Sequence, residues 1–171
     1  ALSYRKLDLL LGGIKRSKDR LQEVLQNLQN EYHYIFIDCP PNITLVSENV
    51  FVAAQFLLVP VIPTTLSMLS YQRLSRFLEK HHYEAGKLFA FFSMVEQRKK
   101  LHQQIISQST GSKLPFLQTQ IPYSAEVEKM GLFRKPIVEC RPNAKASQAY
   151  ERLWQELKPF LKGNQRLKQI N

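Results

Sequence analysis

The stretch that decides the fold reads Ile35-Phe36-Ile37-Asp38-Cys39-Pro40-Pro41. An apolar run ends at one carboxylate, and two prolines then turn the chain away, because proline fixes φ and lacks a backbone N–H donor. Continuous apolar runs are typical of buried strands, and an Asp at the C-terminal tip of such a strand lies where open α/β sheets bind ligands. We therefore predict a buried strand over 32–38 and a binding role for Asp38. The alternative is that Asp38 only caps a helix or forms a turn.

Strands and helices alternate along the rest of the chain. Short apolar runs predict strands at 4–11, 32–38, 56–62, 87–93 and 116–121. Apolar residues at helical spacing predict helices at 17–30, 44–54, 67–82, 99–109, 125–130 and 147–161. Such alternation implies parallel βαβ units, so we expect an α/β fold with a mostly parallel sheet and helices on both faces. We assign residues 1–162 to this single domain and 163–171 to a basic tail.

The charge balance favours a polyanionic partner. Lys and Arg number 24 against 14 acidic residues, which gives a formal net charge of +10. Such an excess favours nucleic acid first and an acidic membrane surface second, although many basic domains bind neither. No apolar run reaches the ~20 residues that cross a bilayer. The two cysteines, Cys39 and Cys140, lack metal-ligand spacing, and we expect a cytoplasmic protein.

Further motifs follow the Asp38 stretch in order, and together they resemble those of one family. They are Ser47-Glu48-Asn49-Val50-Phe51, the run from Leu57 to Ser67, Arg98-Lys99-Lys100-Leu101-His102, Ile121-Pro122, Gly131 to Pro136, and Ala146 to Leu157. Over residues 30–160 this set resembles the ParA/Soj/MinD partition ATPases and is closest to the ParA-like branch. The resemblance implies a P-loop NTPase-like fold of the deviant Walker A class. It also implies a chromosome- or plasmid-partitioning ATPase, an ATP-dependent homodimer that binds DNA nonspecifically on the nucleoid and meets a ParB-like centromere-binding protein.

One part of that family's nucleotide site has no counterpart in the sequence. The family holds phosphate with a glycine-rich loop of the type K-G-G-x-G-K-[ST], whose backbone N–H groups cradle the ligand. The nearest stretch, Gly12-Gly13-Ile14-Lys15-Arg16-Ser17, lacks the second Gly-Lys-[Ser/Thr] unit and is typical of a strand-to-helix turn. We therefore expect the chain to correspond to the C-terminal two-thirds of such an ATPase, without its N-terminal strands and phosphate loop.

The resemblance also assigns roles at the nucleotide site. Asp38 would face Mg²⁺ through water, and Pro40 and Pro41 would shape the switch II loop that senses the γ-phosphate. The wall of the adenine pocket would be formed by Ser93, Met94 and Pro122. No catalytic residue is expected in this chain, and ATP and Mg²⁺ are expected in the intact protein, with weak or no binding by this chain alone. From the residues alone, Met94 is more often a core residue than a ligand contact.

For DNA, the resemblance favours Arg98, Lys99 and Lys100, three cations where a loop meets a helix. The alternative is a solvated charged turn. Where several ParA-like proteins carry arginines after the Ile-Pro turn, this chain has Tyr123 and Glu126. Other cations would compensate if they share a face: Lys113, Arg134, Lys135, Arg141 and Lys145.

Two other functions remain open. The chain could be a non-catalytic relative that binds DNA or a partner, or a membrane-associated positioning ATPase of the MinD kind. The second would use the last helix, where one apolar face is formed by Leu153, Trp154, Leu157, Phe160 and Leu161. We expect that face to cover the sheet instead, and we do not expect a membrane partner.

Overall fold

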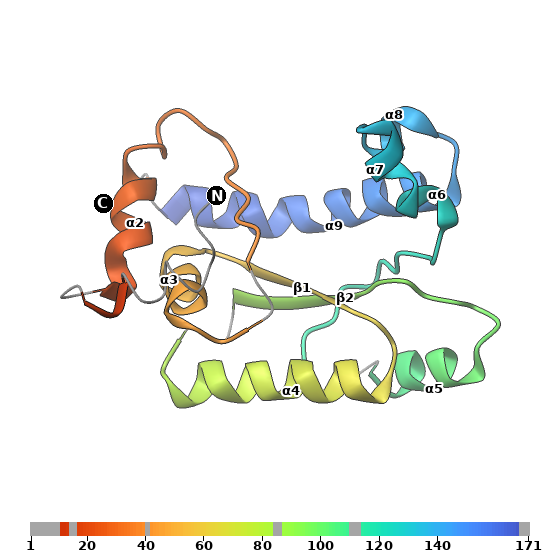
Figure 1. Ribbon diagram of the computed structural model, residues 1–171, viewed down its shortest axis with the longest axis horizontal. Helices are drawn as coiled ribbons and strands as arrows, with labels where there is room; N and C mark the ends of the chain where they lie inside the picture. The colour runs from red at the N-terminus through yellow and green to blue at the C-terminus, as the bar shows by residue number, and fades with distance from the viewer. Residues whose placement is uncertain (1–10, 14–16, 40–41, 84–86, 110–113, 168–171) are drawn as a thin grey trace. The chain divides into compact units, whose positions relative to one another are not determined.

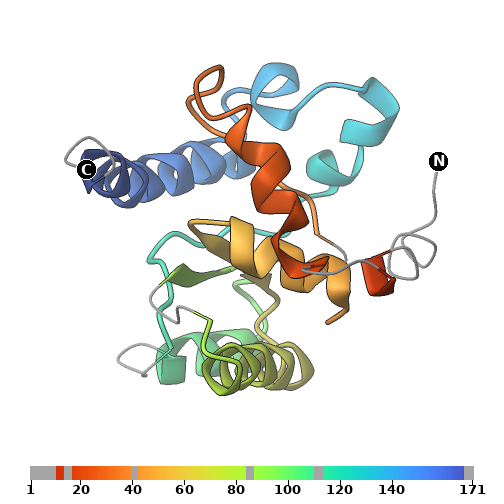
Figure 2. The ribbon, with the colours of Figure 1, turned by 90° about the vertical axis from the view of Figure 1, so that its left-hand side faces the viewer.

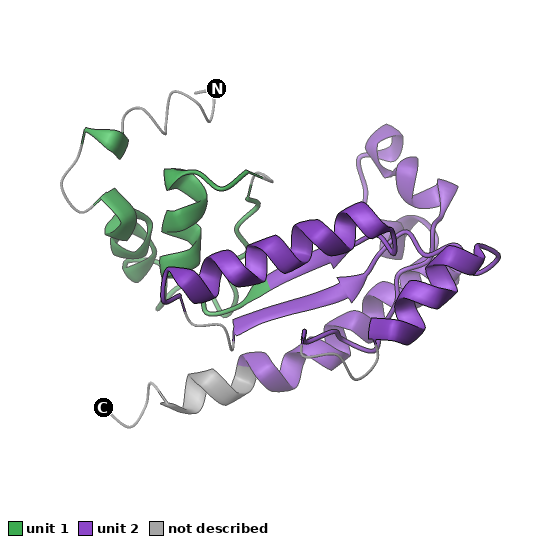
Figure 3. Ribbon diagram, turned by 90° about the horizontal axis from the view of Figure 1, so that it is seen from below, with its two compact units in different colours: residues 1–57 green, residues 58–171 purple. Residues whose placement is uncertain are grey.

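The computed structural model describes residues 11–13, 17–39, 42–83, 87–109 and 114–167 (Figure 1). The chain divides into two compact units, residues 1–57 and 58–171, which Figure 3 colours separately. The single domain predicted over 1–162 stays a prediction.

The described part of the first unit is mainly helical. Its elements are η1 (Ser17–Asp19), α2 (Arg20–Gln26) and α3 (Leu45–Ala53). They confirm the helices predicted over 17–30 and 44–54, with shorter bounds. The Leu21 N–H donates to Asn49 Oδ1 at 3.2 Å, and Lys18 Nζ lies 2.5 Å from the Glu48 carboxylate. These two contacts join the η1–α2 segment to α3.

The strand predicted over 32–38 is wrong. Residues 34–39 run outside any strand, and the Phe36 side chain is 79% exposed. A strand is stable only when its backbone groups pair with a neighbour, and the described residues of this unit hold no complete strand beside which it could lie. The predicted strand over 4–11 lies almost wholly outside the described residues.

The second unit contains the predicted βαβ arrangement. It is formed by β1 (Leu57–Val61), α4 (Thr65–Lys80) and β2 (Leu88–Phe92). The two strands are hydrogen-bonded neighbours, and their arrows point the same way in Figure 3. Figure 2 shows α4 on one side of the strands and α9 (Lys145–Leu167) on the other. Helices therefore cover both faces of the sheet, as the alternating pattern predicts.

The strand predicted over 116–121 is only partly formed. The Leu117 N–H donates to the Ala90 carbonyl at 2.7 Å, and the Ile121 N–H donates to the Phe92 carbonyl at 2.8 Å. Ala90 and Phe92 are two residues apart along β2, whereas their partners Leu117 and Ile121 are four residues apart, so this segment contains two extra residues. The segment runs parallel to β2 at both ends but leaves the ladder in between, so only isolated bridges remain.

The two residues that leave the ladder are held by α9. One oxygen of the Glu156 carboxylate accepts from the Gln118 N–H at 2.6 Å, and the other accepts from the Thr119 N–H at 2.9 Å. These two backbone N–H groups lose their partners in the sheet and bind a charged carboxylate instead. Hydrogen bonds to a charged acceptor are stronger than those between neutral groups. One side chain therefore explains why the bulge is stable.

Hydrophobic packing covers both faces of β2. Toward α9 the buried cluster consists of Phe91, Leu117, Ile121, Ala149 and Leu153. Toward α4 the Phe92 ring stacks on Phe116 with centroids 4.4 Å apart, and the Tyr71 ring meets Phe116 edge-on at 5.2 Å. Burial raises the pKa of Tyr71 to about 12. The alternation of side chains along the strand thus anchors one helix on each face.

Shorter helices complete the second unit. They are α5 (Lys100–Ser109), α6 (Ala125–Glu128), α7 (Met130–Phe133) and α8 (Ile137–Cys140). The sequence predicts α5 and one turn over 125–130, but it misses α8. α9 runs to Leu167 instead of ending at 161, so its helix enters the segment predicted as a basic tail. Residues 168–171 lie outside the described ranges.

The Glu156 contact gives a test of this packing. Glu156→Gln keeps the shape of the side chain but removes its charge and one acceptor, so we expect a loss of about 1–3 kcal/mol in unfolding free energy. Urea unfolding followed by circular dichroism measures it. Glu151→Gln is the matched control, because Glu151 is an exposed carboxylate of the same helix. Equal stability of the two variants would contradict the assigned role.

Candidate functional site

The candidate site lies where β2 ends. Ser93 N–H donates to the Val61 carbonyl at 2.9 Å, which ties the exit of β2 to β1. Met94 follows with φ 54°, a left-handed conformation that is uncommon for residues other than glycine and turns the chain sharply. Val95 then forms a parallel bridge with Pro122. Backbone strain of this kind is found often at binding sites, and it sets the direction of the next turn.

The three residues predicted to wall an adenine pocket are therefore brought together. Ser93 and Met94 immediately precede the bridge to Pro122, and the Tyr123 N–H donates to the Val95 carbonyl at 3.0 Å. Met94 is 43% exposed, so it does not serve as a core residue. Their contact with a nucleotide stays a prediction.

The basic turn, which we define as residues 96–100, is held by side chains from α5. The His102 ring is only 4% exposed, and its Nδ1 accepts from the Glu96 N–H at 3.1 Å. This hydrogen bond requires a lone pair on Nδ1, so the neutral ring carries its proton on Nε2. Gln103 donates from Nε2 to the Gln97 carbonyl. The turn is thus fixed at two backbone positions.

The cations of the basic turn differ in their partners. Lys99 Nζ lies 2.5 Å from the Glu96 carboxylate. Arg98 and Lys100 are exposed, and no carboxylate of the described residues forms an ion pair with either. Two cations are therefore available to an anion, while a third is already paired within the chain.

A groove of about 610 Å³ runs beside the basic turn. Its lining includes Arg98, His102, Gln103, Ser107 and Gln120. Guanidinium and amide groups of this kind bind phosphate and other polar ligands. The groove joins the start of α5 to the bulged segment beside β2.

Acidic groups follow the Ile-Pro turn. The Tyr123 hydroxyl hydrogen-bonds to Glu128, and this bond together with the charge of that carboxylate raises the pKa of Tyr123. Glu126 lies 3.8 Å from Arg141. Arg141 is thus partly neutralised, whereas Arg134, Lys135 and Lys145 are exposed. Lys113 lies outside the described residues.

The predicted magnesium contact belongs to the first unit. Asp38 is exposed and lies outside any helix or strand. Burial together with the Asp38 charge raises the pKa of the neighbouring Cys39 thiol. Pro40 and Pro41 lie outside the described residues. Across the described ranges, no group of three or more His, Cys, Asp or Glu side chains could share a metal ion. A role for Asp38 toward Mg²⁺ stays a prediction.

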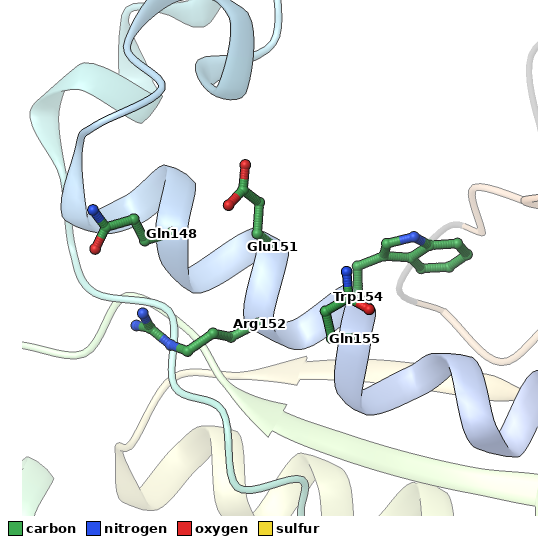
Figure 4. A pocket seen from close by; sticks show the side chains of 5 residues that line it. All are labelled: Gln148, Glu151, Arg152, Trp154 and Gln155. Carbon is green, nitrogen blue, oxygen red and sulfur yellow. The ribbon is translucent and has the colours of Figure 1, made fainter.

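The last helix offers little to a ligand. A depression of about 490 Å³ is lined by Gln148, Glu151, Arg152, Trp154 and Gln155. All five side chains come from α9 and spread in different directions (Figure 4), so no polar groups converge on one point. The Leu153 side chain packs into the core, which confirms the sheet-covering prediction for this helix. None of the helices within the described ranges has the length and apolar composition needed to cross a membrane.

Comparison with known proteins identifies the family. Residues 2–90, just over half of the 171, match the AAA domain family. A ParA family protein of Chlamydia muridarum is 26% identical over 152 residues, which cover 86% of this chain. The chromosome-partitioning ATPase Soj of Treponema pallidum is 26% identical over 147 residues, which cover 80% of it. The chain belongs to the AAA domain family, in its ParA/Soj/MinD group. It spans 59% and 56% of the length of these two relatives.

Solved structures show the fold of this ParA-like chain. The cell division ATPase MinD of Pyrococcus furiosus matches with a TM-score of 0.68 at 17% identity, covering 94% of this chain and 63% of MinD. Cobyrinic acid a,c-diamide synthase of Mycobacterium smegmatis, solved with an ATP analog and magnesium, matches with a TM-score of 0.60 at 20% identity, covering 68% and 50%. The P-loop NTPase-like α/β fold is thereby confirmed. The absence of N-terminal strands and of the phosphate loop stays a prediction.

Sequence reasoning missed three polar residues of the ParA-like chain's site. His102 belongs to the basic motif, but nothing in the sequence indicates that its ring is buried and holds the basic turn. Glu96 lies three residues before Lys99, a spacing that permits an ion pair and could have been noticed. Gln120 had no recognisable signal, because it joins the groove through the bulge opposite Glu156.

Proposed function

We propose that the intact protein is a ParA-type partition ATPase and that this chain contributes its DNA-binding surface. The observation that carries the proposal is the basic turn, where Arg98 and Lys100 are exposed at the carboxyl end of β2 without a carboxylate partner in the described residues. Family membership and the net charge of +10 support it. An ATP-dependent homodimer, a ParB-like partner and residence on the nucleoid belong to the same proposal.

Contacts of this kind recognise the phosphate backbone and not the bases. Arg98 lies on a surface turn and Lys100 is only the first residue of α5, so neither belongs to the body of a helix that could enter a major groove. They would position DNA without reading its sequence. Each phosphate neutralised releases counterions, which makes binding weaken steeply with salt. Nonspecific DNA is therefore the partner that this chemistry fits best.

For nucleotide, we propose that this chain supplies only part of the site. Mg²⁺ is usually held by one or two carboxylates together with water and substrate phosphates. Asp38 is an exposed carboxylate that can serve as one such contact, while the sequence contains no glycine-rich phosphate loop. Magnesium would neutralise charge on the β- and γ-phosphates. The phosphates of the nucleotide would then be held by a segment outside this chain. This is supported by the relative from Chlamydia muridarum, of whose length the chain spans only 59%.

A non-catalytic DNA-binding protein is the second candidate. The basic turn serves it equally well, because contact with a phosphate backbone needs no nucleotide site. A phosphate loop encoded upstream of residue 1 in the gene would favour the ATPase, and an initiator codon next to residue 1 would favour the binding protein.

Both candidates predict that this chain alone binds MgATP weakly. We expect no saturation below about 1 mM in a calorimetric titration, because a P-loop NTPase obtains most of its phosphate contacts from the loop that the sequence lacks. Titration of the complete gene product under the same conditions is the control. Micromolar affinity of the 171-residue chain would refute the partial-site proposal.

The basic turn predicts the salt dependence of DNA binding. Arg98→Ala combined with Lys100→Ala should lower affinity for random-sequence duplex at 50 mM salt and reduce the slope of log K against log salt by about 2. Fluorescence anisotropy measures both quantities. The control is Arg152→Ala, which removes an exposed cation of α9. It should leave the slope unchanged and change the affinity by less than about twofold. An unchanged slope in the double variant would exclude the turn as the DNA contact.

Glu96 competes with phosphate for Lys99 in this proposal. Glu96→Gln should free the Lys99 ammonium, tighten DNA binding by about threefold to tenfold and steepen the salt slope by about 1. Glu139→Gln makes the same charge change at an exposed position of α8 and should have a smaller effect. If both variants behave alike, the effect is one of net charge and the competition does not exist.

A further inference from the structure

The outward side of α4 carries a pattern that neither the sheet nor the basic turn uses. Its members are Leu66, Leu69, Arg73, Arg76 and Lys80. They are separated by three, four, three and four residues, the spacing of the a and d positions in a coiled coil. We call them the α4 seam. The buried residues of α4, Tyr71 and Leu78, lie on the opposite side of the helix.

The two leucines of the α4 seam are unusually placed. Leu66 is 78% exposed and Leu69 is 44% exposed, although a surface helix normally turns polar residues outward. The sequence predicts a helix over 67–82 but does not show which of its apolar residues face the core. Helix periodicity alone could not decide, because the helix has apolar residues on both sides. Exposed apolar side chains grouped in this way mark contact surfaces.

The charges of the α4 seam restrict what can cover it. Arg73, Arg76 and Lys80 follow the leucines along the axis, and no carboxylate of the described residues forms an ion pair with them. The N-terminal half of the α4 seam is therefore apolar and its C-terminal half is basic. A complementary surface must be apolar at one end and acidic at the other.

We propose that the α4 seam binds an α-helix of another protein, with an acidic first half and an apolar second half, in the antiparallel direction. The heptad spacing calls for a helix as the occupant. Acidic residues are most favourable near a helix N-terminus, which places that end beside the basic C-terminal half of α4. This proposal does not depend on DNA binding.

Other occupants fit less well. A second copy of α4 matches the seam poorly in either direction: packed in parallel it would place arginine against arginine, and packed antiparallel it would place leucine against arginine. The one carboxylate of α4, Glu79, lies outside the seam and accepts a hydrogen bond from Ser75. DNA would leave the leucines without apolar contact. A lipid surface would require the apolar and basic groups to lie at two depths, whereas the seam arranges them along the axis in the plane of the surface.

Synthetic peptides test the proposal with the complete 171-residue chain. The probe is a labelled peptide of about 21 residues, three heptads, with Glu at a and d in the first half and Leu at a and d in the second. A peptide of the same composition with its halves exchanged is the comparison. Anisotropy should show at least about tenfold tighter binding of the first peptide. Leu66→Ser with Leu69→Ser should weaken it about tenfold or more.

Charge reversal gives the second measurement. Arg73→Glu with Arg76→Glu should abolish binding of the acidic peptide and create binding of a version with Lys in place of Glu. Leu101→Ser, at an exposed leucine of α5, should change nothing. Equal binding of both peptide orders, no binding up to about 100 µM, or insensitivity to the leucine substitutions would each overturn the proposal. The proposal would also be overturned if the chain bound phosphatidylserine vesicles through Leu66 and Leu69 and did not bind the peptide.

Discussion

Backbone hydrogen bonding along β2 is the constraint on which the second unit depends. One edge of β2 pairs with β1, and the other accepts the segment from 115 to 123 at both of its ends. Between these ends two residues leave the ladder, and the Glu156 carboxylate replaces the lost pairing. Backbone N–H groups that leave a ladder need another partner, so the Glu156 contact lets the chain change register and still reach Pro122 beside Val95.

The same pairing creates the candidate site. The bridge between Val95 and Pro122 fixes the exit of β2, and the left-handed Met94 directs the following residues outward. His102 and Gln103 then hold the basic turn at two backbone positions. Charged side chains on a fixed turn lose less entropy on binding than those on a free loop, which favours the proposed contact with a phosphate backbone.

The sequence predicted the elements whose signals are local. Apolar spacing located α2, α3, α4, α5 and α9 and the strands β1 and β2, because amphipathic faces and short apolar runs are properties of neighbouring residues. It failed at 32–38, where a buried strand was predicted but the residues lie outside any strand and Phe36 is exposed, because pairing and burial depend on a partner strand that a local apolar run does not reveal. It also failed to predict the bulge, since nothing near Gln118 reveals that a carboxylate 38 residues later will accept its N–H. Of the candidate site, the motif order named the cations of the basic turn and three residues that lie together at the end of β2, whose predicted role at an adenine pocket stays a prediction. The burial of His102 and the pairing of Glu96 required the fold.

The central claim is that the turn at the end of β2 is the surface that meets a polyanion. Amide hydrogen exchange, measured with and without random-sequence duplex DNA at low salt, tests it most directly. The account predicts slower exchange on DNA addition for residues 96–104, with α9 residues 148–155 unchanged. Unaltered exchange over 96–104, combined with slowing in another part of the chain, would contradict it.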